Sequence, residues 1–441
     1  MKIKITDGSK FSIRNLRTKP AMPKLLGGSF AVAVCFMAMM FVAPANAVPV
    51  QLLSVRNPSV PLPAGGDGNS AAPSLSPDDR FVVFTSTAND LVPGGNSGYA
   101  LNVFLRDRTG NTTVLVSGSL NGTGGGNGNS MLGQVSTNGQ FVVFQSDASN
   151  LVLNDTNGVT DIFVKDLVAG TTTLVSASTN GGPANGASAD AVMTPAGRYV
   201  AFISSASNLV PGDTNGIPDI FVRDLIAGTN CLMSVGALLA SGSSSSTMAT
   251  PVITPDGRYV AFFSLAKNLV PGVPGTSTGE VYLRDRLMGT TTWASSNASA
   301  IVSATLGLSA MPAYHPRLSD DGRYVAFKAG PTTTTGAVVI LQYDSAMATT
   351  SVINTNSIGW STTLDDSCGP EMTPDGRFIT FAKHEGSLGS GYASVHVWDT
   401  HLNLDTLVSD NGNGVPTNTT SYAPEISPNG QFVASLSNAL I

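Results

Sequence analysis

One short phrase recurs seven times along the chain, and this recurrence limits the folds that the sequence can adopt. Each copy combines a Ser or Thr, a few polar turn residues and a strand that begins with Phe or Tyr. Successive copies start 54 to 65 residues apart, which is room for four short strands and their turns. The copies begin at Ser76, Ser136, Thr194, Thr254, Ser319, Thr373 and Ser427. A unit of this size cannot bury its own sheet, so we expect neighbouring units to cover one another.

The copy that runs from Thr254 to Phe262 shows the local chemistry of the repeat. Asp256 and Gly257 suit a hairpin turn, because Gly accepts positive φ and Asp can bond to its own backbone. Third strands are expected over residues 161–166, 219–224 and 280–285, each followed by a Thr-rich fourth strand such as 171–176. The sequence therefore predicts an all-β chain folded as a β-propeller of about seven four-stranded blades.

An apolar residue precedes every copy of the phrase. Because each blade is covered on both faces by its neighbours, this column is the expected packing layer between blades. Its members are Leu75, Val135, Met193, Ile253, Leu318, Met372 and Ile426.

The two ends of the chain are expected to share the last blade. Residues 51–55 resemble a fourth strand but precede the first full repeat, so a strand at about 50–56 would complete blade seven. The chain ends after residues 432–441, where other copies continue into a third strand. The last blade is therefore predicted to be composite and incomplete, either irregular or truncated.

The first 47 residues have a different composition from the rest. Seven basic residues precede an apolar run from Leu25 to Val42, which ends at Ala45-Asn46-Ala47. This order is typical of a cleaved signal peptide, so we expect residues 1–47 to be removed and residues 48–441 to form the propeller in the periplasm or outside the cell. A retained transmembrane anchor is the alternative, because the run is nearly long enough to span a bilayer.

Removal of residues 1–47 would make the protein strongly acidic. It leaves 16 basic and 28 acidic side chains, a net charge of about −12, which disfavours nucleic acid and anionic lipid as partners. Cys231 and Cys368 remain in different repeats and are expected to be unpaired. We expect a monomer without a membrane span.

The repeats resemble those of the TolB-like β-propeller family, whose hallmark is Pro-Asp-Gly-Arg followed by an aromatic residue. Residues 254–262 and 373–378 match it best, and the resemblance spans roughly residues 50–441. It implies a propeller that binds or scaffolds, since the family includes periplasmic binding proteins and accessory domains of peptidases. Nothing in this sequence corresponds to the N-terminal α/β domain of TolB itself.

Two loops carry a pattern of oxygen ligands that Ca²⁺ could use. They place Asp, Asn and Asp around a Gly, although neither has the bidentate Glu of an EF-hand loop. Ordinary turn chemistry explains the same residues, and the equivalent loops of other units lack the aspartates. The residues are Asp155, Asn157 and Asp161 in one loop, and Asp213, Asn215 and Asp219 in the other.

A second candidate site lies in the first strands, which line the central channel of a propeller. Its residues come one position before the apolar column described above. This column reads Ser74, Gln134, Val192, Val252, Arg317, Glu371 and Glu425. The last three come from consecutive units, and His315 is expected on the strand face of Arg317. They could hold a small polar ligand, or they could be a solvated channel wall.

The sequence assigns no catalytic residue, so the leading hypothesis is an exported module that binds or scaffolds a protein, peptide or glycan partner. One alternative is a lyase- or glycosidase-like enzyme that uses Glu371 and Glu425, with the pKa of one of them raised. Another is a structural surface module stabilised by calcium. The other histidines show no metal-ligand spacing and are expected to be structural.

Overall fold

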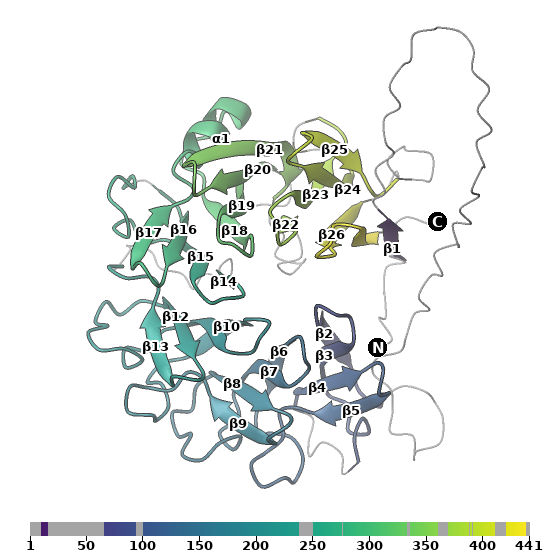
Figure 1. Ribbon diagram of the computed structural model, residues 1–441, viewed down its shortest axis with the longest axis vertical. Helices are drawn as coiled ribbons and strands as arrows, with labels where there is room; N and C mark the ends of the chain where they lie inside the picture. Colours follow the sequence, from purple (N-terminus) through teal and green to yellow (C-terminus); the bar gives the residue numbers. More distant parts are fainter. Residues whose placement is uncertain are drawn as a thin grey trace, which may run out of the picture.

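The strands form seven groups around a central opening, as Figure 1 shows. The structure, a computed structural model, describes residues 10–15, 66–93, 100–237, 250–275, 277–332, 336–359, 369–387, 389, 391–410 and 420–437. Within a group, each strand pairs antiparallel with the next in sequence. The first strands lie nearest the opening and the fourth strands lie at the periphery. The predicted propeller of about seven blades is confirmed.

The strands of blades 1 to 3 follow the repeat closely. Blade 1 has β2 (Ser70–Leu75), β3 (Phe81–Ser86), β4 (Asn102–Asp107) and β5 (Thr112–Leu115). Blade 2 has β6 (Ser130–Val135), β7 (Phe141–Ser146), β8 (Asp161–Asp166) and β9 (Thr171–Leu174). Blade 3 has β10 (Ser188–Met193), β11 (Tyr199–Ser204), β12 (Asp219–Asp224) and β13 (Thr229–Leu232).

Blades 4 to 7 vary more. Blade 4 has β14 (Val252–Ile253), β15 (Tyr259–Ser264), β16 (Glu280–Asp285) and β17 (Thr290–Trp293). Blade 5 has β18 (Ala313–Leu318), β19 (Tyr324–Ala329), β20 (Ala337–Asp344) and β21 (Thr349–Ile358). Blade 6 has β22 (Glu371–Met372), β23 (Phe378–His384), β24 (Ala393–Asp399) and β25 (Leu404–Leu407), and blade 7 has β26 (Ser421–Ile426) and β27 (Phe432–Ser437). A bridge between Ser357 and Lys383 joins blades 5 and 6 into one sheet.

A strand from the N-terminal region lies beside blade 7. Strand β1 (Lys10–Asn15) pairs antiparallel with β27, from Lys10 opposite Ser437 to Asn15 opposite Phe432. The third strands of other blades use the same register, as in Asp219 opposite Ser204. The sequence analysis did not predict this strand. The segment expected to complete the blade, residues 50–56, lies outside the described residues, as does the apolar run 25–42.

Hydrogen bonds explain each residue type of the repeated phrase. In blade 4, Thr254 Oγ1 donates to Asp256 Oδ1 (2.5 Å) and accepts from the Tyr259 backbone N–H (3.0 Å). Asp256 Oδ1 accepts from the Arg258 N–H (2.9 Å). The Arg258 guanidinium lies 4.7 Å from the centre of the Tyr259 ring and pairs with Asp285 at the end of the third strand (2.7 Å). The phrase therefore fastens a hairpin to its third strand.

The glycine of this phrase lies against the aromatic ring of the preceding blade. A Cβ placed on Gly257 would lie 2.1 Å from the ring of Tyr199, so only glycine fits. Six junctions repeat the contact, with ring atoms 2.1 to 2.6 Å from the added Cβ. The pairs are Gly139 with Phe81, Gly197 with Phe141, Gly257 with Tyr199, Gly322 with Tyr259, Gly376 with Tyr324, and Gly430 with Phe378. We call this contact the glycine latch.

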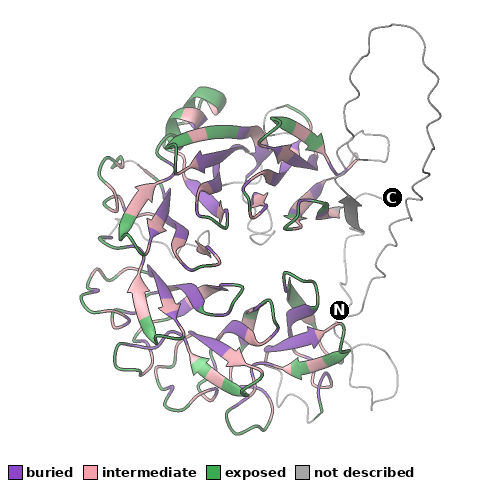
Figure 2. Ribbon diagram, in the orientation of Figure 1, coloured by how far each residue is buried: buried purple, intermediate pink, exposed green. Residues whose placement is uncertain are grey.

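The hydrophobic core is divided among the blades and the junctions between them. One buried cluster joins Val83 and Val103 of blade 1 to Phe144 of blade 2, and Figure 2 shows buried residues concentrated on the second and third strands of the blades. The apolar column that precedes the phrase is buried or half-buried in six blades. The expectation is wrong for Leu75, which is 55% exposed. Leu75 lies in blade 1, at the end of the ring, where a blade covers only one side.

One helix interrupts the strands and was not predicted. Helix α1 (Ala298–Leu306) lies in the longest spacing of the repeat, between blades 4 and 5, and ends at Gly307 with φ +68°. Ala298 and Val302 bury one side of α1 against blade 5. Among the described residues, no helix has the length and apolar character needed to cross a membrane.

The glycine latch predicts a difference between two glycine substitutions with the same backbone strain. Gly257 and Gly170 both have φ +72°, but a Cβ at Gly170 would meet nothing within 4 Å. Both changes to Ala cost roughly 1–2 kcal/mol for the left-handed conformation. Gly257→Ala should cost a further ~1–3 kcal/mol because the methyl group overpacks the Tyr199 ring. Urea unfolding measures both, and equal losses would contradict the latch.

Candidate functional site

A bulge shapes the first strand of five blades. One non-glycine residue has φ between 48° and 54° in each, and the pairing with the second strand shifts register just after it. A bulge of this kind re-aims the side chains that follow. The residues are Ala72, Leu132, Asp190, His315 and Ala423.

Arg317 and Glu425 follow these bulges, and Glu371 takes the equivalent position in β22 of blade 6. Arg317 lies opposite Ala326, Glu371 opposite Thr380, and Glu425 opposite Ala434, each on the second strand of its own blade. Strands β18, β22 and β26 lie side by side around the central opening in Figure 1. The structure therefore places the three residues on neighbouring channel-lining strands.

Arg317 and Glu371 join blades 5 and 6 through an ion pair. Arg317 Nη2 lies 2.6 Å from Glu371 Oε1, and Nε donates to the same oxygen at 2.8 Å. Their side chains are 26% and 21% exposed, so the pair is partly shielded from water. Glu371 is therefore held in place and its charge is balanced by Arg317.

Glu425 is the second carboxylate of this group. Glu425 is an exposed residue by surface area, although many protein atoms surround its carboxyl group and limit its hydration. This burial raises the pKa of Glu425 to about 7, the charge of Glu371 raises it further, and Arg317 acts in the opposite direction. Glu425 makes no hydrogen bond or ion pair with the residues that the structure describes. It is a carboxyl group that changes charge near neutral pH.

His315 does not join this group through a described contact. Its own φ of +53° breaks the alternation that placed it on the face of Arg317. The ring is buried, 4% exposed, and packs edge-on against Tyr314 with centroids 5.1 Å apart.

The calcium-like loops precede the third strands of blades 2 and 3, and their polar groups bond to one another. Asn157 Nδ2 donates to Asp161 Oδ2 (2.6 Å), and Ser176 Oγ donates to Asp161 Oδ1 (2.5 Å). Asn215 and Ser234 donate to Asp219 in the same way, at 2.7 and 2.5 Å. In each loop, the carboxylate at the end of the loop therefore accepts hydrogen bonds from protein donors.

Asp155, the other carboxylate of the first loop, has one oxygen without a hydrogen-bond partner among the described residues. This oxygen is Oδ1, and the residue is 7% exposed. Burial raises the pKa of Asp155, and burial together with the charge of Asp155 raises the pKa of Asp161 to about 6. Burial also raises the pKa of Asp213 and of Asp219. Each loop thus holds two buried acids that a cation could stabilise, although no three His, Cys, Asp or Glu side chains converge in the described part of the chain.

A polar cluster in blade 6 was missed by the sequence analysis. His396 Nδ1 lies 2.7 Å from Asp405 Oδ1, and Nε2 lies 2.8 Å from Glu385 Oε1 and 3.0 Å from Ser394 Oγ. This arrangement contains Ser, His and Asp, but the Ser394 hydroxyl donates to Glu385 Oε1 and so does not present its proton to the ring, as a serine nucleophile would. The ring stacks on Phe381, as Phe163 stacks on Phe144 in blade 2, so the cluster replaces an aromatic pair. The available signal was a His at a third-strand position that is otherwise aromatic or aliphatic, as in Phe163 and Leu341.

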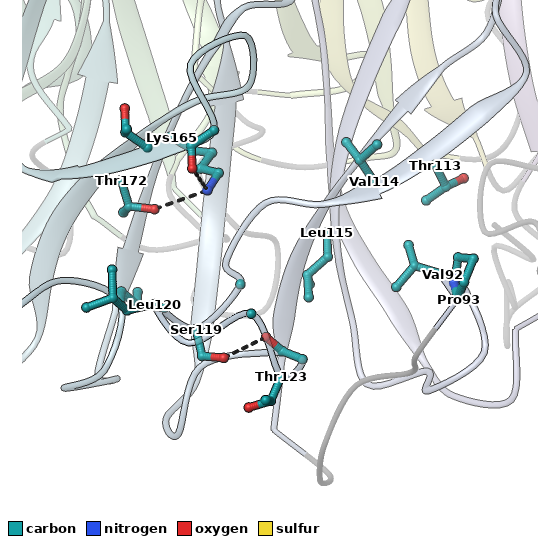
Figure 3. A pocket seen from close by; sticks show the side chains of 16 residues that line it. Val92, Pro93, Thr113, Val114, Leu115, Ser119, Leu120, Thr123, Lys165 and Thr172 are labelled. Atoms are coloured by element: carbon teal, nitrogen blue, oxygen red, sulfur yellow. Dashed lines mark hydrogen bonds between the residues drawn. The ribbon is translucent and has the colours of Figure 1, made fainter.

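A groove of about 920 Å³ lies at the periphery, between blades 1 and 2. Figure 3 shows Leu115, Leu120 and Val92 along its walls. Its one charged lining residue, Lys165, donates to the Gly170 carbonyl at 2.8 Å. The groove contains none of the candidate residues and brings no reactive groups together.

The chain is similar to several solved propeller structures at low sequence identity. Neither a protein-family model nor a curated protein matches the chain. Among solved structures, TolB from Acinetobacter baumannii is 16% identical, with 85% of this chain and 65% of that chain covered and a TM-score of 0.39. An oligogalacturonate lyase in complex with manganese is 13% identical (82% and 87% covered, TM-score 0.48). The β-propeller domain of the Trilobed protease from Pyrococcus furiosus is 11% identical (85% and 98% covered, TM-score 0.43).

The solved structures that match include TolB proteins and other propellers. This chain spans about two thirds of the length of the Acinetobacter TolB. At these identities the likeness concerns the fold alone.

Proposed function

We propose that this propeller is an exported binding module, and that its channel takes a cationic group presented by a protein or peptide partner. The observation that carries the proposal is the pairing of Glu371 with Arg317 while Glu425 has no ion-pair partner among the described residues. The three side chains bring one positive and two negative charges together when Glu425 is ionised. A ligand cation would restore the balance and stabilise the carboxylate form of Glu425.

Export belongs to the same proposal. Its support is the order of basic residues, apolar run and Ala45-Asn46-Ala47 in the first 47 residues. Cleavage after residue 47 would also remove β1 and leave β27 without that partner strand. The expected charge of about −12 after cleavage also favours basic partners over nucleic acid. A glycan partner fits less well, because neutral sugars do not relieve the excess negative charge.

The channel proposal predicts pH-dependent binding of a lysine side chain. Calorimetry would compare acetyl-Gly-Lys-Gly-amide with its norleucine counterpart at pH 5.5 and 8.5. Affinity for the lysine peptide should rise with pH, because the pKa of Glu425 is about 7 and only the ionised carboxylate attracts the ammonium group. Glu425→Gln should weaken binding at pH 8.5 by roughly tenfold or more, the value of a hydrogen bond to a charged group.

Asp147→Asn is the matched control, since it removes an exposed carboxylate outside the channel. It should leave the affinity unchanged. Binding by Glu425→Gln equal to that of the wild type, or affinity independent of pH, would contradict the proposal.

An enzyme is the second candidate, supported by the contrast between the two carboxyl groups. A carboxyl group with a pKa of about 7 beside one paired with Arg has the division of roles that a general acid and an ionised carboxylate require. Turnover of a glycoside or uronate by the wild type, lost in Glu425→Gln, would replace the binding proposal with this one.

We also propose that Ca²⁺ stabilises blades 2 and 3 through the two Asp-Asn-Asp loops. The support is the unpartnered, buried Oδ1 of Asp155 and the raised pKa values of the paired acids. Asn157 and Asn215 would have to turn their amide oxygens towards the ion, because their nitrogens now face the closing carboxylates.

Thermal unfolding in EDTA and in millimolar CaCl₂ tests the calcium proposal. Added Ca²⁺ at about 100 times its dissociation constant should stabilise the fold by about 2.7 kcal/mol and raise the midpoint. The variant Asp155→Asn/Asp213→Asn should lose this shift. A wild-type midpoint that is the same in EDTA and Ca²⁺ would remove the ion from the account.

A further inference from the structure

Two neighbouring junctions of the ring, blade 1 with blade 2 and blade 2 with blade 3, share one backbone frame at the periphery. At the first junction the Leu120 N–H donates to the Asn150 carbonyl of blade 2 (2.8 Å). At the second, the Thr179 N–H donates to the Asn208 carbonyl of blade 3 (3.0 Å). Groups at equivalent positions of the two junctions are therefore held in about the same relation to one another.

A side-chain amide closes the second junction. Asn230, on β13 of blade 3, donates from Nδ2 to the Ala177 carbonyl of blade 2 (2.7 Å) and to the Leu209 carbonyl of its own blade (3.0 Å). Its Oδ1 accepts a hydrogen bond from Arg223 Nη1 (3.2 Å). One primary amide thus bonds to three groups and joins the two blades.

The first junction has counterparts of these three groups but no amide between them. The residue at the position of Asn230 is Thr172, whose Oγ1 lies 3.5 Å from Lys165 Nζ. Among the described residues, no donor bonds to the Gly118 carbonyl or to the Leu151 carbonyl. The counterparts are Gly118 for Ala177, Leu151 for Leu209, and Lys165 for Arg223.

The same three residues, Gly118, Leu151 and Lys165, line the groove of about 920 Å³ between blades 1 and 2. Figure 3 shows Lys165 beside Thr172, on the wall that blade 2 supplies. Leu120 adds an apolar side chain that is 56% exposed. The volume is typical of a ligand pocket and is larger than one amide group fills. The groove therefore has room for an amide and for apolar groups next to it.

We propose that this groove binds an asparagine side chain of a polypeptide partner, in an extended segment with apolar neighbours. The bound amide donates to the Gly118 and Leu151 carbonyls and accepts from Lys165, as Asn230 does with its own three partners. Lys165 has three N–H donors, so it keeps its bond to the Gly170 carbonyl (2.8 Å). The inference is independent of the channel proposal, because the groove contains none of the channel residues.

The chemistry of the three groups sets the specificity of the site. An aspartate side chain has no N–H for the two carbonyls, and an alanine side chain has neither donor nor acceptor. A small free amide would leave the apolar wall uncovered, so the site favours an asparagine within a chain over an amide alone.

An NMR titration of protein labelled with ¹⁵N-glycine tests the site. The probe is acetyl-Val-Asn-Val-N-methylamide, whose methylated end carries no second primary amide. Signals of Gly118 and Gly122, which line the groove, should shift, whereas Gly181, the counterpart of Gly122 at the second junction, should not. Probes with Asp or Ala in place of Asn should bind roughly tenfold more weakly or worse, because they lose hydrogen bonds to the groove. Equal affinity for the three probes, or no shift with the Asn probe, would overturn the proposal.

Thr172→Asn supplies the amide from within the chain. The variant should unfold at a higher temperature than the wild type and should no longer bind the Asn probe. Thr291→Asn is the matched control, because Thr291 holds the same position in blade 4 and accepts from Arg284 (2.9 Å) outside the groove. It should bind the probe as the wild type does. Wild-type affinity in Thr172→Asn, or equal loss in both variants, would show that the probe does not occupy the place of the amide.

Discussion

The contact on which this structure depends is a glycine backbone pressed against the aromatic ring of the neighbouring blade. A four-stranded sheet of about five residues per strand buries too little surface to be stable alone, so each blade relies on its neighbours. The glycine permits a close approach that any Cβ would block, and the arginine over the ring extends the contact to the third strand of its own blade. The repeated phrase thus encodes the hairpin and the junction together.

Because the latch fixes the blades, the first strands are free to differ. Their bulges recur, but the residues that follow range from Ser74 and Val192 to Arg317 and Glu425. The charged members of this column, Arg317, Glu371 and Glu425, lie in blades 5 to 7. Variation of these residues on a repeated framework is how a propeller acquires a site.

The fold could be predicted from the sequence because several independent features of the repeat indicate the same strands. The spacing, the turn residues and the strand composition all placed a third strand at 161–166, where β8 lies. What could not be predicted depends on three-dimensional context. The bulge at His315 interrupts the strand alternation from which its face was predicted, and the exposure of Leu75 follows from its place at the end of the ring. The cluster around His396 joins residues 9 to 11 positions apart, a spacing that matches no recognised motif. Strand β1 carries no copy of the phrase.

The most direct test of this account is the chemical shift of the glycine α-protons. Protons above an aromatic ring are shielded by its ring current, so in protein labelled with ¹³C-glycine the six latch glycines should give upfield-shifted signals. Tyr199→Leu should return the signal of Gly257 to the ordinary range and leave the others in place. Latch glycines with ordinary shifts in the wild type would contradict the packing on which the whole ring depends.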